Sequence, residues 1–162
     1  MNTARPIAVT LTAMILTVGL GAQAKPDFSG TWVLVAPQPG APSTLVIKQD
    51  ATSVSETDGE TADSHTVSVK LDGSETRTTM PAHTAPSGQP VFKNDEIVLL
   101  STATWQGNTL VLATAGTYPS GLKRSVVRSW TLGGDNQLQV EVTMRSDNQE
   151  PRTIKAVYKK KA

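Results

Sequence analysis

The chain contains no cysteine, and this absence removes several classes of protein from consideration. No disulfide can hold an exported fold together, so such a fold must rest on its core alone. A lipidated cysteine anchor is excluded for the same reason. Aromatic residues are also scarce, with three tryptophans, two tyrosines and two phenylalanines. So few aromatic side chains cannot build the two girdles of a transmembrane β-barrel.

Side chains that commonly carry catalysis are few as well. The chain has two histidines, His65 and His83, so a zinc site would need both of them together with carboxylates from separate segments. It has no Gly-x-Ser-x-Gly elbow, no phosphate-binding glycine loop and no acidic run with the spacing of a calcium loop. We therefore predict no enzymatic activity, no metal and no cofactor.

An excess of charge of either sign is missing too. The chain has 15 basic and 14 acidic residues, and Arg5 is the one charged residue among the first 24. Without those 24 residues the formal net charge is therefore zero. A balanced charge gives no reason to expect nucleic acid or an anionic membrane surface as a partner.

The first 24 residues have the features of a secretory signal peptide. Arg5 supplies the positive start, residues 7–20 are almost continuously apolar, and Ala22-Gln23-Ala24 has the small residues of a cleavage site. The apolar run is shorter than the roughly 20 residues that a membrane-spanning helix needs. We predict cleavage after Ala24, which leaves residues 25–162 as one periplasmic or secreted domain with no integral membrane segment.

After residue 24, short β-branched segments alternate with turn dipeptides. Asp72-Gly73 and Gly107-Asn108 are typical of tight hairpins, since their residues tolerate positive φ. The pattern predicts an all-β fold, a single antiparallel up-and-down β-barrel of about 8–10 strands. Closure into a barrel would remove exposed sheet edges. The longer connections at residues 58–64 and 80–96 would lie over an open end. The predicted strands cover residues 30–35, 44–49, 53–57, 66–71, 74–79, 97–105, 109–115, 126–132, 138–145 and 153–159.

Alternation within the strands predicts which side chains face inward. In residues 138–144 the even positions are all apolar, and in residues 126–132 the same logic places Arg128 inward beside Trp130. A guanidinium on an inward face must be paired or solvated. Either Arg128 lies at the barrel rim and pairs with a loop carboxylate such as Asp95 or Glu96, or it lies in a cavity and binds a ligand's carboxylate or phosphate.

Several motifs resemble those of the lipocalins and the wider calycin barrels, in particular small exported bacterial proteins of unassigned function. They are Phe28-Ser29-Gly30-Thr31-Trp32, the hairpin at residues 104–112, the segment at residues 128–132 and the terminal Val157-Tyr158-Lys159-Lys160. In that family the first-strand tryptophan packs under a basic side chain of the final strand. The resemblance therefore implies barrel closure by Gly30, Trp32 and Arg152, with Lys155 as the next candidate for the basic side chain.

The resemblance and the inward pattern together predict a carrier of a small, largely apolar or amphipathic ligand. If that ligand has an acidic head group, Arg128 in a cavity would bind it. Binding cavities are mostly apolar and contain a few polar groups. A small barrel is also just wide enough to be filled by its own side chains, so the alternative is a filled interaction module whose residues 80–96 contact another exported protein. The predicted cavity residues are Leu34, Ile47, Val69, Leu99, Leu112, Arg128, Trp130, Val140, Val142 and Tyr158.

Overall fold

A computed structural model of the chain describes residues 24–59, 66–80, 97–117, 121–147 and 149–161. The predicted signal peptide, except for Ala24, lies outside the described residues. So do His65 and His83, and so do Asp95 and Glu96, the two carboxylates considered as partners of Arg128.

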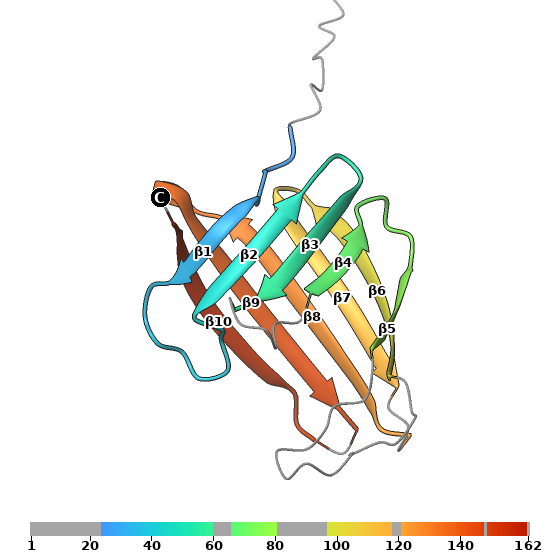
Figure 1. Cartoon of the computed structure of the whole chain (residues 1–162). Helices are drawn as coiled ribbons and strands as arrows, with labels where there is room; N and C mark the ends of the chain where they lie inside the picture. The colour runs from blue at the N-terminus through green and yellow to red at the C-terminus, as the bar shows by residue number, and fades with distance from the viewer. Residues whose placement is uncertain (1–23, 60–65, 81–96, 118–120, 148, 162) are drawn as a thin grey trace, which may run out of the picture.

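The described chain forms ten antiparallel strands in one sheet, which curls into a nearly closed barrel (Figure 1). Every predicted strand is present, with bounds that differ from the prediction by a few residues at most. A single 3₁₀ turn, η1 (Gly134–Asn136), joins the eighth strand to the ninth. The strands are β1 (Gly30–Leu34), β2 (Thr44–Gln49), β3 (Ser53–Asp58), β4 (Thr66–Lys70), β5 (Thr76–Met80), β6 (Ile97–Gln106), β7 (Thr109–Thr117), β8 (Lys123–Leu132), β9 (Gln137–Ser146) and β10 (Arg152–Lys160).

The strand order around the sheet is β4-β3-β2-β1-β10-β9-β8-β7-β6-β5. Consecutive strands pair with each other, except β4 and β5, and β1 pairs in addition with β10, where Trp32 lies opposite Lys160. The predicted all-β, antiparallel up-and-down barrel is therefore confirmed. The tight turns at Gly107, with a φ of +60°, and at Asp135 and Asn136, with φ of 59° and 54°, reverse the chain as predicted.

One predicted hairpin is wrong. Asp72-Gly73 does make a turn, with Gly73 at a φ of +79° and the Asp72 carboxylate accepting the Ser74 amide at 2.8 Å. The flanking strands do not pair with each other, because β4 and β5 are the two edges of the sheet. Residues 71–75 separate the strands, a loop longer than the two-residue turn that would hold them in a ladder.

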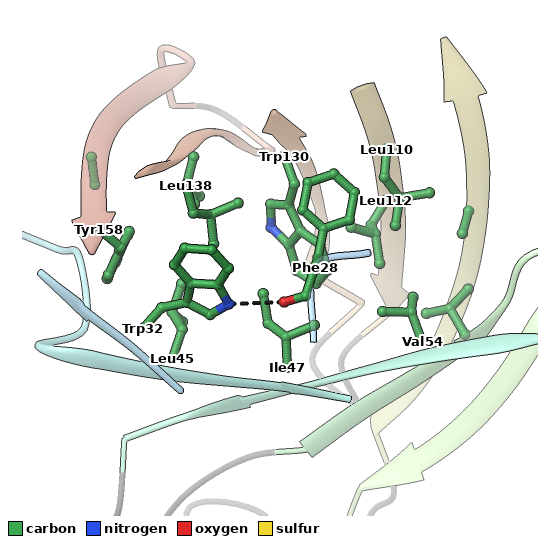
Figure 2. Close-up of a cluster of buried hydrophobic side chains, with 14 residues drawn as sticks. Phe28, Trp32, Leu45, Ile47, Val54, Leu110, Leu112, Trp130, Leu138 and Tyr158 are labelled. Atoms are coloured by element: carbon green, nitrogen blue, oxygen red, sulfur yellow. Dashed lines mark hydrogen bonds between the residues drawn. The ribbon is translucent and has the colours of Figure 1, made fainter. Parts of the chain in front are cut away.

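An aromatic cluster fills the end of the barrel at which the chain enters. Phe28, Trp32 and Trp130 are buried there (Figure 2), and Trp105 packs against them. Phe28 stacks on Trp105 at 6.0 Å between ring centroids and meets Trp130 edge-on at 5.8 Å. The Trp32 indole N–H donates to the Phe28 carbonyl at 2.8 Å, which ties the segment before β1 into the core. We call this end of the barrel the plugged end.

The predicted basic partner of Trp32 is wrong. Lys160, not Arg152, covers the Trp32 ring, with its Nζ 5.5 Å from the centroid. Arg152 begins β10 opposite Met144 and donates to the Pro39 carbonyl at 3.3 Å. Since an extended strand rises about 3.4 Å per residue, Arg152 lies at the opposite end of the barrel. Gly30 lies against the same lysine, since its φ is +140° and a Cβ there would approach the Lys160 Cε to 2.5 Å.

Candidate ligand-binding site

A cavity of about 210 Å³ lies inside the barrel, on the side away from the plugged end. Its walls come from the inward faces of β2, β3, β8, β9 and β10 and from the loop between β1 and β2. Strand alternation brings these side chains together, since in each strand the inward residues follow one another at every second position. The apolar lining consists of Leu45, Val126, Val140, Val142, Met144, Ile154 and Ala156, and the polar lining of Glu56, Asp58, Arg128 and Tyr158.

An ion pair connects two walls of this cavity. Arg128 on β8 approaches Glu56 on β3, with 3.4 Å between Arg128 Nε and Glu56 Oε2. The Arg128 side chain is 21% exposed and that of Glu56 only 7%. Glu56 lies between Ile47 of β2 and Val67 of β4 in the ladders, so its carboxylate has apolar neighbours on either side. The pair therefore places one positive and one negative charge in mostly apolar surroundings.

Burial has a strong effect on the acidity of Glu56. Desolvation raises the pKa of its carboxyl to about 7, although the nearby Arg128 guanidinium lowers it, and Asp58 raises it further. A buried carboxylate is costly because water no longer stabilises its charge. Glu56 therefore changes its charge close to neutral pH, where an ordinary glutamate is fully ionised.

The loop between β1 and β2 covers one side of the cavity, and two side chains of β10 donate hydrogen bonds to it. The Tyr158 hydroxyl donates to the Pro42 carbonyl at 3.1 Å, and the Arg152 guanidinium donates to Pro39. Gly40 in the same loop has a φ of +84°, a conformation that favours glycine. Burial, together with the nearby carboxylates, raises the pKa of Tyr158, so its hydroxyl stays protonated.

A second cavity, of about 360 Å³, adjoins the first and shares Val126 and Met144 with it. Its other lining residues are more polar and include Arg124 and Arg152. The free space inside the barrel therefore extends toward the end where β9 is joined to β10. We call that end the open end.

The structure brings four of the predicted cavity residues to the first cavity, and it places the others elsewhere. Arg128, Val140, Val142 and Tyr158 line the cavity. Leu34 packs against the hydrophobic core, and Leu99 lines the second cavity. The remaining four, Ile47, Val69, Leu112 and Trp130, are buried in the packed core rather than on the cavity wall.

Arg128 combines features of both interpretations drawn from the sequence. It lines a cavity, and it is also paired with a carboxylate. The partner is Glu56, which does not stand out in the sequence because the segment at residues 53–57 is polar. The signal was nevertheless present, since Val54 and Glu56 occupy alternate positions and Val54 is inward.

The nearly closed, antiparallel up-and-down barrel is consistent with a lipocalin-like fold. No protein-family model matches the chain, and none of the curated proteins matches it either. Among the described residues, no helix has the length and apolar character needed to cross a membrane.

Proposed function

We propose that this protein is an exported, lipocalin-like carrier, which binds a small and mostly apolar ligand with an acidic head group inside its barrel. The observation that carries this proposal is the 210 Å³ cavity, in which apolar side chains surround Arg128. Ligand sites are typically mostly apolar, with a few polar groups that orient the ligand. A guanidinium is well suited to bind a carboxylate, because it offers two parallel N–H donors.

The shape of the site suggests how such a ligand would lie. The head group would bind at Arg128, and the apolar tail would contact Val140, Val142 and Ile154. The cavity is smaller than the roughly 300–1,000 Å³ of sites for drug-sized ligands. The ligand is therefore a short-chain molecule, or one that extends into the second cavity toward the open end.

Two measurements test the carrier. Native mass spectrometry of the protein isolated from its own periplasm should show a bound small molecule that is released on denaturation. Calorimetric titration with octanoate, and with octanol as the uncharged counterpart, should show that both bind. A clean apo mass together with no heat from either probe would overturn the proposal.

A matched pair of variants locates the binding. Ala156→Leu adds bulk on the cavity wall, whereas Val157→Leu adds it to the neighbouring side chain, which points outward and is 38% exposed. We expect Ala156→Leu to weaken octanoate binding at least about tenfold by occupying the space of the tail. Val157→Leu should leave binding unchanged. Equal effects of the two variants would show that octanoate binds elsewhere.

The second candidate is the filled interaction module, and the small size of the cavity favours it. A space of about 210 Å³ is compatible with a barrel that is packed for stability alone. This candidate predicts that no probe binds and that the melting temperature does not move across a panel of lipids and metabolites. The proposed contact segment, residues 80–96, lies mostly outside the described residues.

A further inference from the structure

A ligand carboxylate that enters the cavity meets an arginine that already has a partner. Glu56 lies 3.4 Å from Arg128, and its side chain is only 7% exposed. If Glu56 stayed ionised, two carboxylates would share one guanidinium in apolar surroundings, and like charges at such a site disfavour each other strongly. One of the two carboxylates must therefore leave or become neutral.

Glu56 has little freedom to leave. It projects inward from the middle of β3, whose backbone is paired with β2 on one side and with β4 on the other. Both ladder neighbours of Glu56, Ile47 and Val67, are apolar, so neither offers a new partner for a displaced charge. Neutralisation is the remaining route.

We propose that Glu56 gives up Arg128 to the acidic head of the ligand and takes up one proton as it does so. This inference rests on the proposed function and specifies its chemistry. The ligand carboxylate replaces that of Glu56 as the counter-ion of Arg128, and a proton from solvent converts the Glu56 carboxylate to a carboxyl group. The net charge of the site is the same before and after binding. The ligand class is thus an apolar monocarboxylic acid.

The groups that face Glu56 support this assignment. Arg128 approaches from β8 and remains charged, as guanidinium groups do in proteins. Tyr158 approaches from β10, and its raised pKa keeps it protonated. Asp58, two residues along β3, adds a negative charge that favours the protonated form of Glu56. Burial brings the pKa of Glu56 to about 7, so the proton is taken up at little cost near neutral pH.

The proposal makes binding of a carboxylate depend on pH. Where Glu56 is already protonated, at about pH 6, the ligand binds without proton uptake. At about pH 8, Glu56 is mostly ionised before binding, so octanoate should bind about tenfold more weakly and take up about one proton. Octanol brings no charge, so its affinity should change little over the same range.

Calorimetric titration of the full protein with octanoate measures the proton directly. At about pH 8, the heats of titrations in phosphate and in Tris should differ by the difference between the two buffers' ionisation enthalpies, multiplied by about one proton. The Glu56→Gln variant keeps the shape of the side chain and cannot take up the proton. We expect it to show no such difference and to bind octanoate equally well at both pH values.

Glu141→Gln is the matched control, since Glu141 pairs with Lys155 on the exposed surface at 3.0 Å and should leave proton uptake as in wild type. If octanoate bound with the same proton uptake in wild type and in Glu56→Gln, the role of Glu56 would be overturned, but the proposed carrier function would not. If wild type bound octanoate at about pH 8 without taking up a proton, the conclusion would be the same. That second measurement does not depend on whether the variant folds. If neither octanoate nor octanol bound, both proposals would fail.

Discussion

The buried carboxyl of Glu56 should make the fold less stable as the pH rises through neutrality, even without a ligand. Its pKa is raised from 4.5 to about 7 in the folded state. Between these two pH values the folded protein holds more protons at this site than the unfolded protein does. By linkage, the stability that protonation of Glu56 contributes is complete below pH 4.5 and is lost as the pH rises to about 7.

The magnitude follows from the size of the shift. Each pKa unit corresponds to about 1.4 kcal/mol, so a shift from 4.5 to about 7 changes the free energy of unfolding by about 3 kcal/mol. Glu56→Gln removes the titrating group and, with it, the counter-ion of Arg128, and the variant has no group at this site whose charge changes with pH. The difference in unfolding free energy between this variant and wild type should therefore move by about 3 kcal/mol in favour of the variant between about pH 4 and pH 8.

Urea unfolding of both proteins at several pH values measures this difference. The comparison with wild type is needed because Asp27, Asp50 and Asp72 have lowered pKa values. Their protonation in acid makes the fold less stable, which is opposite in sign to the effect of Glu56. Because both proteins contain these three residues, their effect cancels in the difference. For Glu141→Gln, at an exposed ion pair, the difference in unfolding free energy from wild type should hardly change with pH. If the difference for Glu56→Gln did not change with pH either, the reasoning would be refuted, since Glu56 would then titrate like an ordinary glutamate.

Three further outcomes in urea unfolding check other contacts. Lys160→Met should lose about 0.5–1 kcal/mol, the value of an exposed cation–π contact with Trp32, and no loss would show that the lysine does not hold this end closed. Gly40→Ala should cost about 1 kcal/mol more than Gly121→Ala. Both glycines have a φ above +80°, but only at Gly40 would the new Cβ come within 2.7 Å of another atom, so equal costs would contradict the tight packing of the loop. Tyr158→Phe should cost about 1 kcal/mol by leaving the Pro42 carbonyl unpaired, and an unchanged value would mean that water replaces the hydroxyl.

Local signals in the sequence predict most of this fold. Turn residues mark the reversals at Gly107 and at Asp135, and alternation places Val140 and Val142 on the inward face, because both signals depend only on neighbouring residues. These signals are sufficient for the ladders between consecutive strands, except between β4 and β5, where the turn at Gly73 forms but the strands do not pair. They also explain why the interior position of Arg128 could be predicted.

The other errors arise where segments distant in sequence meet. Lys160 covers Trp32 because of the register between the first and last strands, which no local pattern encodes. Glu56 was missed because a glutamate among serines and threonines usually faces solvent, and only the opposing arginine on β8 explains its burial. The space inside the barrel likewise depends on how the walls meet, so alternation alone could not separate core residues such as Ile47 from cavity residues.

β4 and β5, the strands on either side of residues 71–75, are the two edges of the sheet, so the chain could be opened between them without breaking a ladder. In the described sheet, the ladder between β1 and β10 is the one that joins strands distant in sequence. Residues 72–75 are exposed, and the Lys161 amide donates to the Thr31 carbonyl at 2.7 Å, so the two ends of the barrel chain lie side by side. A circular permutant that is cut in this turn and joined across those ends would have every ladder between consecutive strands. The contact order of this permutant is lower than that of the natural chain, so the permutant should fold faster into the same barrel.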